Sequence, residues 1–231
     1  MEKESFDKPS KPSTASAKNL KADQNFKLEQ NGSGLIIFDF DGTITTKDTF
    51  ALFLRYYAGF WGWLKNILTL MPTFIAYKLR RIDRHAVKAA VIKQFFSNKP
   101  VSDIETHAQQ FAKDVIPGLI RPKALECFKA KVAENDNVYI CSASITPYLF
   151  HWAKAQGFPE KNVLAVELSQ SSGIFSGEIK GYNVWGKNKV RRIFDAFSSE
   201  NIHIAEAYGD SEGDRELLNA AEASFYRPFR V

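Results

Sequence analysis

Two aspartates separated by one residue follow the first apolar run of the chain. The run is Leu35-Ile36-Ile37-Phe38, and the motif after it is Asp39-Phe40-Asp41-Gly42-Thr43. One carboxylate at the end of a strand can act as a nucleophile, and a second one can act as general acid and base. Two such anions repel each other, so a cation is expected beside them. The alternative is an ordinary Asp-Gly turn at the end of a strand.

Two later apolar runs also end in polar residues. Residues 138–141 are followed by Ser142-Ala143-Ser144, where a hydroxyl and a backbone N–H could hold a phosphate oxygen. Residues 202–208 are followed by Gly209-Asp210-Ser211-Glu212-Gly213-Asp214, whose carboxylates suit a hard cation with oxygen ligands. Each motif alone has a plain structural explanation: serines are common at strand ends, and Asp214 could cap the next helix.

A lysine near the start of a helix could neutralise a phosphate. Lys187 and Lys189 both follow Gly186 and open a helix expected over residues 189–197. Such lysines are more often solvated surface residues, and their position alone does not choose between them.

Apolar runs that alternate with helical stretches predict the elements that position these residues. Strands are expected over 35–38, 138–141, 163–166 and 202–208, and a small hairpin over 174–179. Helices are expected over 121–134, 147–156, with Thr146 as N-cap, and 189–197. This alternation predicts an α/β fold with a parallel sheet, in which ligands bind at the carboxyl edge of the strands.

The segment of residues 49–117 shows no strand pattern and reads as several helices. It interrupts the α/β series directly after the first strand, so we interpret it as an inserted helical cap. The core is then formed by residues 34–48 and 118–231. Residues 1–33 are rich in Lys, Ser, Ala and Pro and are predicted to be a disordered tail.

Residues 56–77 carry a single charge, Lys65. A membrane-spanning helix is rejected, because Lys65 and Asn66 lie near its middle and Gly59, Gly62 and Pro72 interrupt it. Two interpretations remain: the segment packs inside the cap, or it lies on an anionic membrane surface. The second rests on aromatic and basic residues that follow one another, namely Tyr56, Tyr57, Phe60, Trp61, Trp63, Lys78, Arg80, Arg81, Arg84 and Lys88.

The composition is that of an ordinary globular protein. Of the 231 residues, 45% are hydrophobic and 25% charged, which excludes collagen, coiled coil and general disorder. Cys127 and Cys141 form neither a disulfide framework nor a zinc site. No signal peptide is evident, so a cytoplasmic location is expected, with a peripheral position at the inner membrane face left open. The net charge of +5 suits phosphorylated partners, whereas no nucleic-acid motif is present.

Taken together and in this order, the motifs resemble those of the haloacid dehalogenase superfamily over about residues 34–230. The insertion directly after the first motif resembles the C1-capped branch, the phosphoserine-phosphatase-like subfamily IB. The resemblance implies a Rossmann-like parallel core with an inserted all-helical C1 cap. It also favours Lys189 over Lys187, because Gly186 to Arg191 matches the Gly-x-x-Lys-Val-Arg pattern of that subfamily.

The resemblance further implies a Mg²⁺-dependent phosphomonoester hydrolase. Asp39 would attack phosphorus and form an aspartyl-phosphate, and Asp41 would protonate the leaving alcohol and then activate water. Ser142 and Lys189 would bind the phosphoryl oxygens. Magnesium would be held by Asp39, the Asp41 backbone carbonyl and Asp210, with Asp214 in support. Remote alternatives are a phosphotransferase, a mutase and a catalytically idle binding protein.

The substrate class stays open at this point. Phosphoserine phosphatases use a Glu and an Arg of the cap to read their substrate, and this chain has Asp48 and Lys93 in the corresponding segments, with Lys88 nearby. Residues 48–56 resemble the phosphatidylglycerophosphate phosphatases of the same subfamily. Phosphoserine or another small metabolite and a lipid phosphate are therefore both candidates.

Overall fold

The computed structural model describes residues 33–197 and 202–230. The tail predicted over residues 1–33 therefore lies outside the described residues, except that Ser33 begins the first strand.

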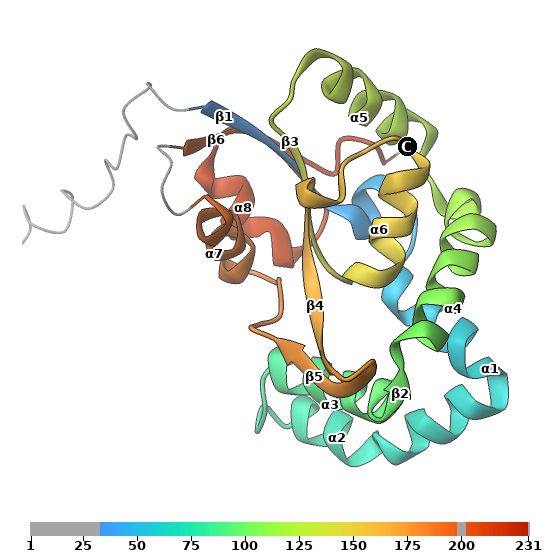
Figure 1. The fold of residues 1–231 in the computed structure, drawn as a ribbon. Helices are drawn as coiled ribbons and strands as arrows, with labels where there is room; N and C mark the ends of the chain where they lie inside the picture. Colours follow the sequence, from blue (N-terminus) through green and yellow to red (C-terminus); the bar gives the residue numbers. More distant parts are fainter. Residues whose placement is uncertain (1–32, 198–201, 231) are drawn as a thin grey trace, which may run out of the picture. The chain divides into compact units, whose positions relative to one another are not determined.

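A seven-stranded sheet forms the centre of the protein, in the order β2-β5-β4-β3-β1-β6-β7 (Figure 1). Neighbouring strands among β1, β3, β4, β6 and β7 pair in parallel, while β5 runs antiparallel to β4 and β2 antiparallel to β5. The predicted α/β class with a largely parallel sheet is confirmed. The strands are β1 (Ser33–Phe38), β2 (Lys99–Pro100), β3 (Val138–Ile145), β4 (Val163–Ser171), β5 (Ile174–Lys180), β6 (Ile202–Gly209) and β7 (Ala221–Tyr226).

Helices flank the parallel strands, with α5 and α6 on one side and α7 and α8 on the other (Figure 1). We keep the name cap for residues 49–117, which contain α1 to α4; α1, α2 and α3 lie together at one end of the molecule, beside β2 and β5. The helices are α1 (Thr49–Thr69), α2 (Met71–Lys78), α3 (Arg84–Phe96), α4 (Val101–Asp114), α5 (Pro122–Glu134), α6 (Thr146–Ala155), α7 (Lys187–Ala196) and α8 (Arg215–Ala220).

The central strand β1 is buried on both faces, which explains its unbroken apolar run. Leu35, Ile37 and Phe38 are almost fully buried. The ring of Phe38 stacks on Tyr208 of β6, with 4.2 Å between the ring centroids. Strand β1 is thereby held rigidly between its two neighbours.

The strand order reverses at β1, because β3 and β4 follow on one side and β6 and β7 on the other. In open α/β sheets a crevice forms at such a switch point, outside the carboxyl ends of the strands. The residues that follow β1 and β6 and the last residues of β3 therefore meet at this crevice. Ser142 was predicted to follow a strand that ends at residue 141, but β3 continues to Ile145, so Ser142 and Ser144 lie within it.

Two local predictions were wrong. Residues 174–179 form one strand, β5, and the hairpin is β4 with β5, joined by Ser172 and Gly173 in left-handed conformations. Gly177 marks a close approach rather than a turn, since an added Cβ would lie 2.8 Å from Ser97. Thr146 makes no capping hydrogen bond and is itself the first residue of α6.

Two short strands were not predicted, because neither has an apolar run. The cap contains β2, which covers Lys99–Pro100 and pairs with β5. The edge strand β7 is mostly exposed and reads as a mixture of small, charged and aromatic residues.

The long helix α1 is not straight, because Gly59 has φ 65° and ψ 170° and bends it. Helix α2 begins directly afterwards, with Pro72 in its first turn, where a missing N–H costs no hydrogen bond. Among the described residues, no helix is both long and apolar enough to cross a membrane.

Candidate active site

Asp39 is the first residue after β1, and its side chain is buried, with 4% of its surface exposed. Its backbone N–H donates to the Tyr208 carbonyl at 2.9 Å, which continues the pairing of β1 with β6. Its Oδ2 accepts a hydrogen bond from the Thr43 hydroxyl at 3.1 Å. The carboxylate is thus fixed at the crevice by its strand and by the loop that follows.

Gly42 lets this loop pass close to the end of β6. Its φ of 84° lies in the left-handed region, and a Cβ added here would stand 2.5 Å from Asp210 Oδ2. Only glycine meets both conditions without strain.

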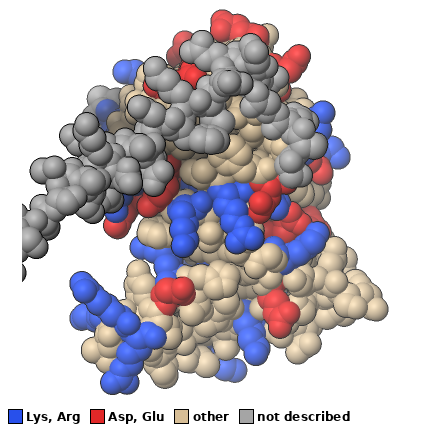
Figure 2. All heavy atoms as spheres, turned by 90° about the vertical axis from the view of Figure 1, so that its left-hand side faces the viewer, with Lys and Arg blue, Asp and Glu red and all other residues tan. Residues whose placement is uncertain are grey.

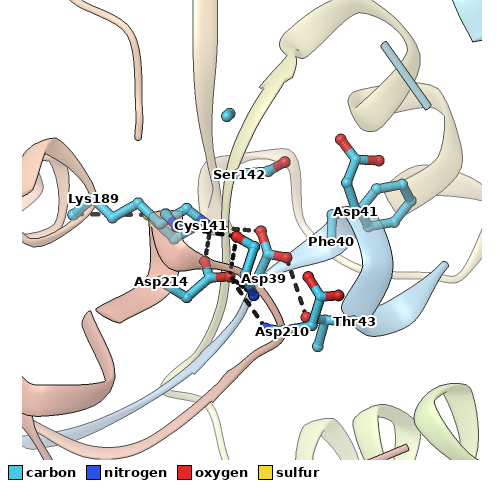
Figure 3. A network of polar contacts seen from close by, with 12 residues as sticks. Asp39, Phe40, Asp41, Thr43, Cys141, Ser142, Lys189, Asp210 and Asp214 are labelled. Carbon is cyan, nitrogen blue, oxygen red and sulfur yellow. Dashed lines mark hydrogen bonds and ion pairs between the residues drawn. The ribbon is translucent and has the colours of Figure 1, made fainter. Parts of the chain in front are cut away.

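The carboxylates of Asp39, Asp210 and Asp214 form a buried cluster (Figure 3). Each offers one oxygen, and these oxygens lie within 4.8 Å of one another. Carboxylate oxygens are the donors that Mg²⁺ and other hard divalent cations prefer. The donor chemistry of the cluster therefore fits the magnesium site that the family resemblance implies.

Lys189 reaches this cluster from the first turn of α7 and is only 2% exposed. Its Nζ lies 2.5 Å from Asp39 Oδ1 and 2.6 Å from Asp214 Oδ1. Burial alone would lower the pKa of Lys189, but the two carboxylates raise it above its ordinary value. Lys187 instead lines a separate cavity beside Asn183, so Lys189 is the lysine that the fold brings to Asp39.

Asp214 lies behind the other two carboxylates and is held by the turn that follows β6. Its Oδ2 accepts hydrogen bonds from the N–H of Asp210 at 3.1 Å and of Ser211 at 2.9 Å, and from the Ser211 hydroxyl at 2.8 Å. Burial would raise the pKa of Asp214, but Lys189 and these bonds lower it below its usual value. Asp210 itself pairs with the guanidinium of Arg230.

Burial raises the pKa of Asp39 to about 8, with the Lys189 charge opposing this shift and the Asp214 charge adding to it. A divalent cation against the cluster would favour the ionised form of Asp39, as any nearby positive charge does. The same carboxylate could then act as a nucleophile near neutral pH.

Asp41 points away from the cluster, toward the cap (Figure 3). Its Oδ1 accepts hydrogen bonds from the Thr49 N–H at 2.9 Å and the Thr49 hydroxyl at 2.6 Å, and its Oδ2 accepts one from the Ser144 hydroxyl. Burial raises the pKa of Asp41 to about 6, assisted by the charge of Asp48 and opposed by the bonds from Ser144 and Thr49. A carboxyl group with such a pKa suits proton transfer near neutral pH.

A cavity of about 340 Å³ opens onto these groups. Ser142 lines it from β3; its side chain is buried, and its hydroxyl accepts the Ser144 N–H at 3.0 Å. Of the residues predicted in the core, the cavity wall contains Asp39, Asp41, Ser142, Lys189 and Asp210.

The predicted recognition residues of the cap differ in their positions. Asp48 is exposed, lines the cavity and caps α1 by accepting the Ala51 N–H at 2.9 Å. Lys93 is exposed, is not part of the cavity wall, and belongs to the turn of α3 whose backbone packs against Gly177 of β5. The structure therefore does not bring Lys93 to the site.

Lys88, one and a half turns earlier on α3, reaches the site instead. Its Nζ donates to the Ala143 carbonyl at 2.9 Å and lies 3.3 Å from the centre of the Phe50 ring. Burial lowers its pKa to about 8, against the charges of Asp48 and Asp41, which raise it. The helix thereby places a cation beside the phosphate-binding segment predicted at Ser142.

Several residues have roles at the site that the sequence motifs did not assign to them. Thr49 and Ser144 hold Asp41, Arg230 pairs with Asp210, and Arg84 lines the cavity. Arg84 precedes Lys88 by one helical turn, a spacing that puts both on one face of α3 and could have been noticed. The roles of Thr49, Ser144 and Arg230 depend on contacts between segments that are far apart in the sequence, so only the folded structure reveals them.

The model of the haloacid dehalogenase-like hydrolases matches residues 36–219, which include every motif described above. The chain belongs to this family. Protein CicA of Caulobacter vibrioides is 36% identical over 216 residues, which cover 93% of this chain and 95% of that protein.

Solved structures share the fold of this haloacid dehalogenase-like chain. A protein of unknown function from Bordetella pertussis has a TM-score of 0.69 at 19% identity, with 82% of this chain and 87% of that chain covered. A phosphoserine phosphatase with a phospho-aspartyl intermediate analogue has a TM-score of 0.53 at 14% identity, with 84% and 85% covered. At these identities the likeness shows the fold alone. The cap resemblance to phosphatidylglycerophosphate phosphatases stays a prediction.

Proposed function

We propose that the protein hydrolyses phosphate monoesters through an aspartyl-phosphate on Asp39, with Mg²⁺ as cofactor. The observation that carries this proposal is the division of charge around Asp39. Lys189 and the carboxylates of Asp210 and Asp214 lie next to the Asp39 carboxylate. Asp41 lies apart from this group and accepts hydrogen bonds from Thr49 and Ser144. The nucleophile and the proton donor thus have separate surroundings within one cavity.

In the first step an Asp39 oxygen forms a bond to phosphorus as the ester P–O bond breaks. The leaving alkoxide takes the proton of Asp41, whose pKa of about 6 allows a protonated fraction near neutral pH. Lys189 and the Ser142 hydroxyl bind the phosphoryl oxygens, where charge accumulates in the transition state.

In the second step Asp41, now ionised, removes a proton from a water molecule that attacks phosphorus. The acyl-phosphate bond breaks, inorganic phosphate leaves, and the Asp39 carboxylate is restored. A magnesium ion held by Asp39, Asp210 and the Asp41 carbonyl, with Asp214 in support, would neutralise phosphoryl charge during both steps.

The substrate class remains part of the proposal. Phosphoserine phosphatases share the fold, but here the cavity is lined by Asp48, the residue before the cap, and by Arg84 of the cap. Lys88 of the cap donates to the Ala143 carbonyl next to the cavity wall. Two cations in this position suit a substrate with a second anionic group. A small phosphorylated metabolite and a lipid phosphate both meet this description.

The experiment that tests the mechanism compares Asp41→Asn with the wild-type enzyme on p-nitrophenyl phosphate. The leaving p-nitrophenolate needs no proton, so the first step should proceed while the second, which needs a base, should stall. We expect a burst of about one p-nitrophenolate per enzyme followed by slow turnover. Mass spectrometry should find the phosphoryl group on the peptide that contains Asp39.

Two controls complete this test. EDTA should abolish the burst, and added Mg²⁺ should restore it. A wild-type enzyme that hydrolyses no monoester in a screen of phosphoserine, sugar phosphates, nucleotides and lipid phosphates would favour the idle binding protein. Transfer of phosphate to an alcohol without release of inorganic phosphate would favour a phosphotransferase or mutase.

A further inference from the structure

The first observation concerns the apolar side chains of the cap. Most of the large apolar side chains that are exposed within the described part of the chain lie between residues 56 and 79. Trp61 is 77% exposed and Leu68 60%. None of the residues of helix α2 is buried.

The spacing of these residues puts them in two stripes. Trp61 and Leu68 are seven residues apart on α1, beyond its bend at Gly59, and Lys65 lies between them. Met71, Ile75 and Leu79 follow every four residues along α2 and its end. Residues at such spacing share one face of a helix. We call these five apolar residues the outer face of the cap.

The charge of this segment has one sign. Residues 49–82 contain no Asp or Glu. Lys78, Arg80 and Arg81 are exposed at the end of α2, where they line a groove of about 610 Å³. The groove has three cations and one carboxylate, that of Asp83, so it is basic on balance. Figure 2 shows Lys and Arg side chains gathered on the lower part of the molecule, next to uncharged surface, and again across its middle. The surroundings of the outer face are thus complementary to an anionic partner.

The basic groove leads toward the candidate active site. Three residues after Arg81, Arg84 begins α3, lines the Asp39 cavity and stacks over the ring of Trp185, with 4.5 Å from its Cζ to the ring centroid. The groove shares Asp83 with the cavity that Lys187 lines, and that cavity shares Arg84 and Trp185 with the Asp39 cavity, so the three openings adjoin one another.

We propose that the outer face of the cap docks on the surface of an anionic lipid bilayer, where the enzyme acts on phosphate esters at headgroup level. The apolar stripes enter the acyl–headgroup boundary, and the basic residues after α2 contact anionic headgroups. A bilayer is favoured over a protein partner because the exposed apolar side chains extend over two helices, beside exposed cations and within a segment, residues 49–82, that has no Asp or Glu. Docking on the bilayer does not depend on the proposed phosphatase function; the action on phosphate esters at headgroup level does.

The test measures sedimentation of the full chain with vesicles. Binding is expected to phosphatidylcholine vesicles that contain phosphatidylglycerol and not to pure phosphatidylcholine, and it should weaken as salt screens the charges. Leu68→Ser/Ile75→Ser should reduce the partition coefficient at least about tenfold, because apolar burial is lost. Ile174→Ser, an exposed apolar residue outside the outer face, is the matched control and should bind as the wild type does.

Two double substitutions test how much the basic residues contribute to vesicle binding. Lys78→Gln/Arg81→Gln should weaken binding about tenfold or more, while Lys123→Gln/Lys129→Gln on α5, which lowers the net charge equally, should change it little. Hydrolysis of soluble p-nitrophenyl phosphate should be the same in all variants, so a failure of docking is distinguishable from a failure of catalysis.

Two results would overturn the proposal. One is the absence of binding to anionic vesicles, or binding that the outer-face variants leave unchanged. The other is self-association in analytical ultracentrifugation that Leu68→Ser/Ile75→Ser abolishes, which would assign the face to a second copy of the chain.

Discussion

The Asp39 cavity and the outer face of the cap use charged and apolar residues in opposite ways. In the cavity, Lys189 is 2% exposed and touches Asp39 and Asp214, so each charge depends on a partner far away in the sequence. On the outer face, Trp61 and Leu68 stand in solvent, and the neighbouring cations are exposed. The charged side chains of the cavity are thus buried and paired with one another, whereas the side chains of the outer face are exposed and separate.

This difference predicts how each region responds to substitution. Removing one member of a buried, interlocked set leaves the others without compensation, and such losses are large. Exposed side chains contribute little to stability one at a time, so the cap should tolerate change in solution.

Asp39→Asn should reduce turnover about 1,000-fold or more, because the amide keeps the shape of the carboxylate but cannot attack phosphorus. The rate of p-nitrophenyl phosphate hydrolysis measures this, with circular dichroism to verify that the fold is kept. A variant that retains more than about a tenth of the wild-type rate would exclude Asp39 as the nucleophile.

Asp210→Asn should raise the Mg²⁺ concentration needed for half-maximal activity about tenfold or more, because the cluster loses one of its carboxylates. A magnesium titration of the activity measures the change. Glu212→Gln, which removes an equal charge from an exposed position two residues later, should leave the titration unaltered. If both variants shift it alike, general electrostatics and not ligation explains the effect.

Gly42→Ala and Gly59→Ala compare the two regions directly, since both glycines have positive φ. At Gly42 the new Cβ would also collide with the Asp210 carboxylate, so we expect a loss of activity and about 2–3 kcal/mol of stability. At Gly59 nothing lies within 4 Å, so only the backbone strain of about 1–3 kcal/mol remains, without a collision at the site. Thermal unfolding and activity assays of both variants test this, and equal activity losses would contradict it.

Lys88→Met should stabilise the protein at pH 7. The folded-state pKa of Lys88 is about 8 against an ordinary 10.5, mainly because of burial. Below pH 8 Lys88 is charged in both the folded and the unfolded protein, and the folded protein pays the cost of burying that charge. Between pH 8 and 10.5 Lys88 is neutral in the folded protein but still charged in the unfolded one. The unfolded state therefore binds more protons, and the stability of the wild type rises with pH over this range. The advantage of the variant should therefore shrink over this range in urea titrations.

Lys93→Met is the matched control for this prediction, since Lys93 lies on the same helix but is exposed. Its stability should follow the wild type at every pH. An advantage of Lys88→Met that grows above pH 8 would contradict the assigned direction of the pKa shift.

The α/β class and the strand ends at which Asp39 and Asp210 lie could be predicted from the sequence. These are local properties, because an unbroken apolar run indicates a buried parallel strand and the next polar residue must stand at its end. The family followed from the same motifs, as the match over residues 36–219 shows.

Only the tertiary structure decided which side chains meet. It places Lys88 rather than Lys93 next to the Ser142 segment, and it supplies Thr49 and Ser144 to Asp41. Lys189, by contrast, was already favoured over Lys187 by the sequence pattern of residues 186–191, and the structure brings its Nζ to Asp39. It also leaves Met71 and Ile75 of α2 exposed. A local sequence pattern does not predict these contacts, because contacts between residues far apart in the chain depend on how the helices pack on the sheet. Periodicity can identify an apolar helix face, but it does not show whether another element covers that face.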